Sequence, residues 1–193
     1  MNKPLHIVIL AAGEGKRMKS KRPKMLQPLG GRPMLTHLLD TVASLRPERV
    51  HVVVGAGSEA VMDACSKHDI DWVHQAERRG TGHAVMQAMP EVPDEAAVLV
   101  LLGDTPLIPA SLLEQMVEAY RGPLALLTME LEDPTGYGRI LRDPGGNIIG
   151  VVEHRDAEAH QHRIREVNTG IIMADADRLK TWLDRVGLSL IHI

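Results

Sequence analysis

The sequence predicts an α/β fold in which a mostly parallel, mixed sheet is flanked by helices. Three observations indicate this fold. Short apolar segments alternate with segments of helical periodicity through the first 120 residues. The segments 6–10 and 98–102 are apolar almost throughout, as expected for strands that are buried on both faces. With 193 residues, of which 44% are hydrophobic and 24% charged, the chain is long enough for one domain with a substantial core.

The first half is expected to alternate strictly between strands and helices. The expected order is strand 6–10, helix 33–45, strand 50–54, helix 59–68, strand 71–74, helix 82–89, strand 98–102 and helix 109–120. The last helix carries Leu112, Leu113, Met116 and Val117 along one stripe, the spacing of a helix with one buried face. Alternation of this kind favours parallel strands joined by crossover helices.

After residue 122 the pattern changes. Strands are expected at 124–131, 139–142, 147–152 and 168–173, followed by a helix at 177–186. The segment "DPGG" between the second and third of these strands is a turn signal. The second half is therefore expected to form a mixed, insertion-rich part of the same sheet.

Charge and cysteine content exclude several classes of protein. The net charge of −3 provides no global basic field for a nucleic acid polymer, so any anion site must be local. One cysteine, Cys65, excludes an intrachain disulfide and is typical of a reducing compartment. The longest apolar run, 96–102, is too short to cross a bilayer, and the N-terminus lacks the features of a signal peptide. We therefore expect a cytoplasmic protein without a membrane partner.

A loop of small and basic residues follows the first strand. Ala11, Ala12 and Gly13 leave room for a flat ligand against the backbone, whose N–H groups bind a base edge or phosphate oxygens. The dinucleotide fingerprint fails at Met18, and the Walker pattern fails because Arg17 follows Lys16. The basic residues of the loop are Lys16, Arg17, Lys19, Lys21, Arg22 and Lys24. They predict a triphosphate site; a solvated basic loop is the alternative.

A second candidate site segment is "QAERRGTGHAV". Gln75 ends a strand and carries both an amide donor and an acceptor, which complements a pyrimidine edge. Gly80 and Thr81 open a helix, and Thr81 is expected to cap it, so that its exposed N–H groups favour an anion or a carbonyl. An ordinary capped helix is the alternative.

Two acidic positions are candidates for substrate or metal contacts. Asp104 follows a buried strand, at the sheet edge where open α/β folds bind ligands, and its carboxylate suits Mg²⁺. A turn aspartate before Thr105 is the alternative. The segment 153–162 is rich in histidine and acidic residues but lacks zinc-ligand spacing. Within it, Glu153 follows an apolar strand and is placed to reach a substrate hydroxyl.

Six segments together resemble one enzyme family. They are "LAAGEGKRM…RPK", "QAERRGTGHA", "LLGDTPLI", "DPTGYGRI", "GVVEHRDA" and "EVNTGI", in this order. The first is shared with many sugar and cytidylyl nucleotidyltransferases, whereas the full set is highly specific. Over residues 5–186 the chain resembles the uridylyltransferase domain of the bacterial bifunctional N-acetylglucosamine-1-phosphate uridyltransferase / glucosamine-1-phosphate N-acetyltransferase. The resemblance implies a Rossmann-like, GT-A-like nucleotidyltransferase domain.

The resemblance also implies residue roles. Carried over by position, it gives catalytic roles to Arg17, Lys24 and Asp104, with Mg²⁺ on Asp104; nucleotide contacts to Leu10, Ala11, Ala12, Gly13, Lys24, Gln75, Gly80, Thr81, Leu102 and Gly103; and N-acetylglucosamine contacts to Gly138, Glu153 and Asn168. The family often has an aromatic residue where this chain has Leu102. That difference removes a ring from the pocket wall without removing a reactive group.

The reaction implied converts UTP and N-acetylglucosamine 1-phosphate into UDP-N-acetylglucosamine and pyrophosphate, for peptidoglycan and lipopolysaccharide precursors. By the same resemblance, the full-length protein would also acetylate glucosamine 1-phosphate with a C-terminal left-handed β-helix domain and form a homotrimer. We expect residues 1–187 to be an incomplete uridylyltransferase domain that lacks a second metal-ligating asparagine. The last residues, "LSLIHI", match the translation of a sequencing adapter, so 188–193 are expected to be a non-native tail.

Other functions remain as alternatives. A cytidylyltransferase of cofactor or isoprenoid synthesis shares the opening loop, although "GTGHA" and "NTGI" argue against it. A non-catalytic nucleotide-binding module is an alternative of a different class. A dehydrogenase is disfavoured by the missing third glycine.

Overall fold

The chain forms two compact units in a computed structural model, which describes residues 3–13, 15, 18, 20, 22–55, 57–77 and 79–185. Unit 1 comprises Met1–Ala125 and Ile172–Ile193, and unit 2 comprises Leu126–Ile171. The sequence contains no linker-like segment at either boundary, so the division into two units was not predicted from it.

Unit 1 is built on a mixed sheet with the strand order β5-β4-β1-β6-β10. Its strands are β1 (Leu5–Leu10), β4 (Arg49–Val54), β5 (Asp71–His74), β6 (Ala97–Leu102) and the C-terminal part of β10 (Glu166–Asp175). β1 lies parallel to β4 and β6, and β4 lies parallel to β5. β10 is antiparallel to β6, with Ile172 opposite Val100. The mostly parallel, mixed sheet is thus confirmed.

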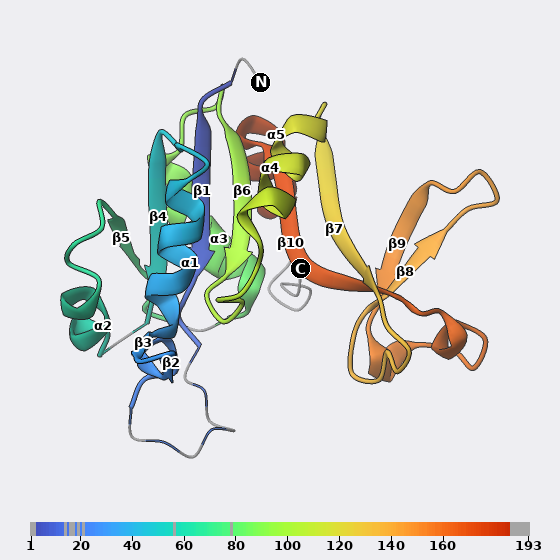
Figure 1. The fold of residues 1–193 in the computed structure, drawn as a ribbon. Coiled ribbons are helices and arrows are strands. Elements are labelled where there is room, and N and C mark those ends of the chain that lie inside the picture. The colour runs from blue at the N-terminus through green and yellow to red at the C-terminus, as the bar shows by residue number, and fades with distance from the viewer. Residues whose placement is uncertain are drawn as a thin grey trace. The chain divides into compact units, whose positions relative to one another are not determined.

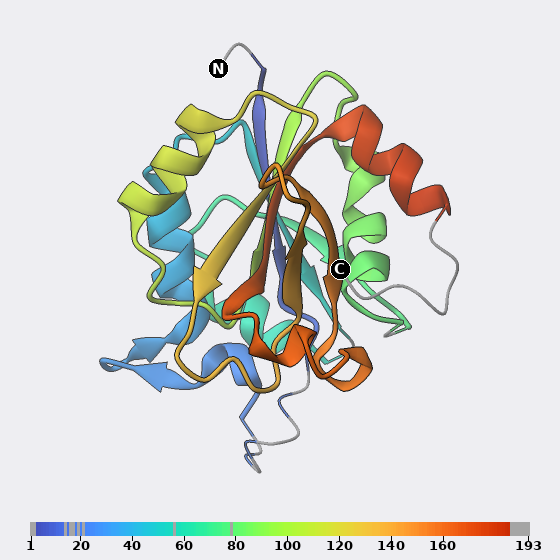
Figure 2. The ribbon, with the colours of Figure 1, turned by 90° about the vertical axis from the view of Figure 1, so that its right-hand side faces the viewer.

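Helices cover both faces of this sheet. They are α1 (Met34–Ala43), α2 (Glu59–Ala64), α3 (Thr81–Ala88), α4 (Ala110–Ala119) and α5 (Ala176–Arg185). α1 and α4 lie on one side of the strands, and α3 and α5 lie on the other (Figures 1 and 2). Ile7, Ile9, Leu99 and Leu101 are fully buried because both faces are covered.

Unit 2 is smaller and antiparallel. β8 (Arg139–Arg142) and β9 (Ile148–Val152) form a hairpin, β8 pairs with β10 where Val167 lies opposite Arg139, and β7 (Leu124–Glu130) also pairs with β10. The turn expected at "DPGG" therefore joins two paired strands. Two 3₁₀ helices, η4 (His154–Asp156) and η5 (Gln161–Arg163), follow β9.

A short segment that the sequence analysis did not recognise is fixed onto α1. It contains the 3₁₀ helix η2 (Lys24–Leu26) and a two-stranded hairpin, β2 (Pro28–Leu29) with β3 (Arg32–Pro33). Strands of two residues are too short to show a period in the sequence.

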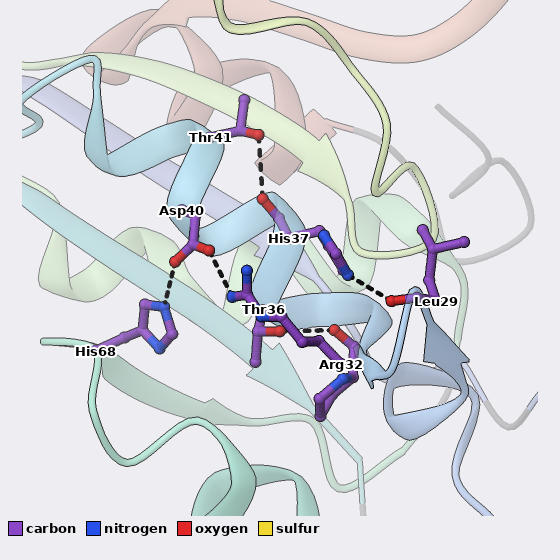
Figure 3. Close-up of polar contacts among 8 residues, drawn as sticks. Leu29, Arg32, Thr36, His37, Asp40, Thr41 and His68 are labelled. Atoms are coloured by element: carbon purple, nitrogen blue, oxygen red, sulfur yellow. Dashed lines mark hydrogen bonds and ion pairs between the residues drawn. The ribbon is translucent and has the colours of Figure 1, made fainter.

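Side chains of α1 hold this hairpin (Figure 3). His37 Nε2 donates to the Leu29 carbonyl at 2.8 Å, and Arg32 Nη2 donates to Asp40 Oδ2 at 2.5 Å. His68 Nε2 donates to the other Asp40 oxygen at 3.0 Å. The bonds from Arg32, and then from His68, lower the pKa of Asp40. Since η2 leads directly into the hairpin, these contacts also fix where Lys24 lies.

Two sequence expectations are wrong in detail. The helix expected at 59–68 ends at Ala64, because Cys65 turns out of the helix with ψ at 10°. Thr81 is not the cap of α3: Gly80, with φ at +105°, occupies the N-cap position and Thr81 is the first helical residue. In the described part of the chain, no helix is both long enough and apolar enough to cross a membrane.

Candidate functional site

A pocket of about 390 Å³ lies within unit 1, where β1 and β6 end. Its lining residues come from the segments that follow these strands, from η2 and from the start of α3. They are Leu10, Ala12, Gly13, Lys24, Met25, Gln75, Gly80, Thr81, Ala84, Leu102 and Asp104. Because β1 and β6 are parallel neighbours, their carboxyl ends meet at one edge, the usual position of ligand sites in open α/β sheets.

The structure brings together most of the residues assigned to the nucleotide. Two of that set do not line the pocket. Ala11 is buried, and its N–H donates to the Val53 carbonyl at 2.8 Å. A Cβ atom on Gly103 would lie 2.9 Å from Met25 Sδ and 3.0 Å from the Leu10 carbonyl oxygen. Gly103 therefore lies directly against the pocket wall, where no larger residue fits.

The phosphate-binding candidates are only partly described. Arg17, like Lys16, Lys19 and Lys21, lies outside the described residues. Lys24 is described: its Nζ donates to Asp104 Oδ2, and the two side chains are 26% and 38% exposed. Gly15 has φ at +63°, and a Cβ atom there would lie 2.9 Å from Lys24 Cβ. Glycine at position 15 therefore lets the loop pass close to the Lys24 side chain.

Asp104 is the only carboxylate among the described residues that line the pocket. Within the described ranges, no three His, Cys, Asp or Glu side chains are grouped to hold a metal ion, and those ranges include the whole of 153–162. A half-exposed carboxylate nonetheless fits an ion such as Mg²⁺, which takes one or two protein carboxylates and completes its shell with water and substrate phosphates. In this structure the Asp104 carboxylate accepts a hydrogen bond from the Lys24 ammonium group.

Gln75 is held by both its backbone and its side chain. The residue is 3% exposed, and its N–H donates to the Val54 carbonyl at 2.8 Å. Its side-chain Nε2 lies 2.9 Å from His83 Nδ1 and 3.4 Å from the Gly80 carbonyl oxygen. The amide is therefore fixed at the pocket surface by groups from the loop before α3 and from α3 itself.

Three residues of this region were not predicted from the sequence: Met25, Ala84 and His83. Ala84 lies three residues after Thr81 on α3, so the helical period alone places both on one face. Met25 directly follows Lys24 and is buried. His83 lies within the segment "GTGHA", but nothing in the sequence indicated that its ring contacts Gln75.

The three residues assigned to the sugar lie together in unit 2. Asn168 N–H donates to the Gly138 carbonyl at 2.9 Å. A Cβ atom on Gly138 would lie 2.9 Å from Val151 Cγ1 and 3.4 Å from Glu153 Oε1. Asn168 Oδ1 accepts a bond from Gly170 N–H at 3.0 Å, which orients the side-chain amide.

Arg139 joins the segments on either side of this cluster, a role that the sequence did not reveal. Its side chain is almost fully buried, at 1% exposure. Nη1 donates to the Tyr137 carbonyl, and Nη2 donates to His154 Nδ1 at 3.2 Å. Tyr137 precedes Gly138 and His154 follows Glu153, so one guanidinium group holds both segments in place.

Comparisons with known proteins agree with these observations. A sequence profile of the MobA-like NTP transferase domain matches residues 7–143. The chain is 53% identical over 186 residues to the bifunctional protein GlmU of Alkalilimnicola ehrlichii, covering 96% of this chain and 40% of that protein. It is also 53% identical over 190 residues to GlmU of Xanthomonas euvesicatoria, covering 98% and 41%. The chain thus spans about two fifths of the length of these curated relatives.

Solved structures match the fold at lower sequence identity. UDP-glucose pyrophosphorylase complexed with UDP-glucose gives a TM-score of 0.75 at 17% identity, covering 98% of this chain and 83% of that one. HddC from Yersinia pseudotuberculosis complexed with GMP-PN gives 0.69 at 20% identity, covering 91% and 78%. At such identities the likeness concerns the fold alone, and the expected Rossmann-like nucleotidyltransferase fold is confirmed.

Proposed function

We propose that this chain, which belongs to the family of MobA-like NTP transferase domains, is the uridylyl-transferring part of a longer enzyme. The reaction joins UTP to N-acetylglucosamine 1-phosphate and releases pyrophosphate. One observation carries the proposal: a single pocket gathers a fixed amide, Gln75, and a partly exposed ion pair, Lys24 with Asp104. The amide suits a pyrimidine and the ion pair suits a metal-bound triphosphate.

The uridine portion is proposed to lie against the small residues of the pocket. Ala12 and Gly13 leave the backbone accessible, and Leu10 and Leu102 provide apolar surface for the base and ribose. Gln75 reads the edge of the base, with Gly80 and Thr81 beside it at the start of α3. These residues all belong to unit 1.

The chemistry requires positioning and charge neutralisation more than proton transfer. A sugar phosphate is already an anion at neutral pH, so it attacks the α-phosphorus without a strong base. Lys24 is proposed to leave Asp104 for the phosphates, and Arg17 is proposed as a second cation. Asp104 is then free to hold Mg²⁺, which would neutralise phosphate charge and orient the triphosphate.

The sugar is proposed to bind the cluster in unit 2. Glu153 offers carboxylate oxygens to sugar hydroxyls, Asn168 offers its remaining amide group, and the missing side chain at Gly138 leaves room beside the Glu153 carboxylate. Acetyl transfer to glucosamine 1-phosphate, a homotrimer and a cytoplasmic location are proposed for the longer protein from the resemblance to the named relatives.

Pyrophosphate release tests the proposal. The chain and the longer gene product that contains it should be assayed side by side with Mg²⁺ and N-acetylglucosamine 1-phosphate, using UTP or CTP. We expect the longer product to release pyrophosphate with UTP and far more slowly with CTP. Calorimetry with UDP-N-acetylglucosamine separates binding from turnover. Equal rates with both nucleotides, or release that does not depend on the sugar phosphate, would contradict the proposal.

A further inference from the structure

A histidine outside the pocket contacts Gln75, the side chain that is proposed to read the base. His83 is the third residue of α3 and does not itself line the pocket, whereas Gln75 does. The two side chains meet at 2.9 Å, between His83 Nδ1 and Gln75 Nε2. The proposed reaction does not use this contact.

Two contacts decide which way the Gln75 amide points. The Gly80 carbonyl oxygen can only accept, so the group 3.4 Å from it must be the amide NH₂. The same NH₂ group faces His83 Nδ1, which must therefore be the unprotonated, accepting nitrogen. The ring proton then sits on Nε2, and the Gln87 amide 3.4 Å away accepts it only with its oxygen turned toward the ring, because two N–H donors do not bond each other.

The carbonyl oxygen of Gln75 is what remains for a ligand. No residue within the described ranges donates a hydrogen bond to Gln75 Oε1. An acceptor held in this orientation suits the ring N3–H of uracil. Cytosine presents an unprotonated nitrogen at the same ring position, so two acceptors would face each other.

We propose that His83 is a positioning residue that sets the preference for uracil over cytosine, by holding the Gln75 amide with its oxygen toward the ligand. The inference rests on the proposed function of the pocket. With His83 removed, the Gln75 amide is free to turn and to offer its NH₂ group to cytosine N3. The preference for uracil over cytosine should then fall more than the overall binding affinity.

The test compares two variants of His83 that differ in whether they offer a hydrogen-bond acceptor to Gln75. His83→Leu removes the acceptor but keeps a branched side chain of similar reach. His83→Asn restores an acceptor, because Asn Oδ1 occupies the position of the ring Nδ1. His74→Leu is the matched control: it makes the same chemical change at the exposed last residue of β5, next to Gln75 in the sequence.

Binding of UDP and CDP to each full-length variant should be measured by calorimetry, together with its Tm. We expect His83→Leu to lower the UDP to CDP affinity ratio about tenfold, the loss of about one oriented hydrogen bond. His83→Asn and His74→Leu should keep the ratio of the unmodified chain. An unchanged ratio in His83→Leu, or an equal loss for both nucleotides, would overturn the inference.

Turnover separates this inference from the proposed function. If the longer gene product releases no pyrophosphate, but His83→Leu lowers the ratio of its affinities for UDP and CDP, the proposed function fails and the inference stands. If it turns over UTP and His83→Leu keeps the UTP to CTP ratio in kcat/KM, the function stands and the inference fails. A rise in KM for UTP at constant kcat is the expected kinetic pattern.

Discussion

Unit 1 and unit 2 differ in the kind of side chain that they bury. In unit 1 the central strands are apolar and fully buried, as at Ile7 and Leu99. In unit 2 the largest fully buried side chain is the charged Arg139, while Ile149 on β9 is 66% exposed. Unit 1 is thus held by apolar packing, and unit 2 depends more on polar contacts between its segments.

The difference suggests a division of labour in the proposed reaction. The sheet of unit 1 positions the pocket proposed for the nucleotide, because β1 and β6 end together at one edge. Unit 2 holds the sugar candidates through a network centred on Arg139.

The largest contrast should be in stability. Leu99→Ala, in the core of unit 1, should lower the free energy of unfolding by about 2–5 kcal/mol, because it leaves a cavity between packed layers. Ile149→Ala in unit 2 should change it by less than about 0.5 kcal/mol. Urea unfolding followed by circular dichroism measures both. Similar losses in the two variants would break the comparison.

The next largest effect should be on catalysis in unit 1. Asp104→Ala in the longer gene product should reduce kcat about 100-fold, since no other described lining residue offers a carboxylate. Asp94→Ala is the control: Asp94 is exposed and pairs with Lys180 away from the pocket, so its loss should leave turnover intact. Near-full pyrophosphate release by Asp104→Ala would refute the role of Asp104.

A smaller effect is expected from the sugar cluster of unit 2. Glu153→Gln should raise KM for N-acetylglucosamine 1-phosphate about tenfold and leave KM for UTP unchanged, because a carboxylate accepts stronger hydrogen bonds than an amide. Glu158→Gln, at an exposed residue of the same segment, should change neither constant. If both KM values rise together in Glu153→Gln, the two units do not divide the substrates.

The smallest effect should appear as a shift of Tm with pH in unit 1. His6 Nδ1 lies 3.0 Å from His51 Nε2 in the core, and burial lowers the pKa of both below the usual 6.5. The unfolded chain therefore binds these protons more readily, so stability present above pH 6.5 is lost as the pH falls toward the folded values. The two tryptophans, Trp72 and Trp182, both belong to unit 1, so their fluorescence should report a falling Tm below about pH 6.5.

Unit 2 should respond in a different pH window. Two hydrogen bonds from Arg142 lower the pKa of Glu166 from 4.5 to about 2, so the stabilisation by this pair persists above pH 4.5 and is lost as the pH falls toward 2. Arg142→Ala should therefore leave the fluorescence-detected change near pH 6 unaltered. A Tm that stays flat through that range in the unmodified chain would contradict the role of the histidine pair.

Much of unit 1 could be predicted from the sequence because its strands are continuous apolar runs. The strand at 71–74 was predicted with its observed bounds, and those at 6–10 and 98–102 missed one residue each. The β2–β3 hairpin was missed because strands of two residues have no period. The convergence of Gln75, Lys24 and Asp104 followed from family resemblance, since they are far apart in sequence.

Unit 2 was less predictable in physical terms. Its strands were predicted, but the buried position of Arg139 was not, because a charged residue at the start of a short strand normally faces solvent.

In unit 1, the contact of His83 with Gln75 could not be predicted from the sequence either, since it depends on where a loop returns α3 to the end of β5. The roles of Arg17, Lys24, Gly138 and Asn168 stay predictions, and the Glu153→Gln variant tests the role of Glu153.

The direction of β1 has a practical consequence for experiments on this protein. β1 runs from Leu5 to Leu10 and reaches the pocket only at its carboxyl end. An affinity tag placed before Lys3 therefore attaches at the opposite edge of the sheet, about 20 Å of strand away. Immobilising the chain through an N-terminal tag should leave the pocket open, so surface-based binding measurements with UDP and CDP are suited to this molecule.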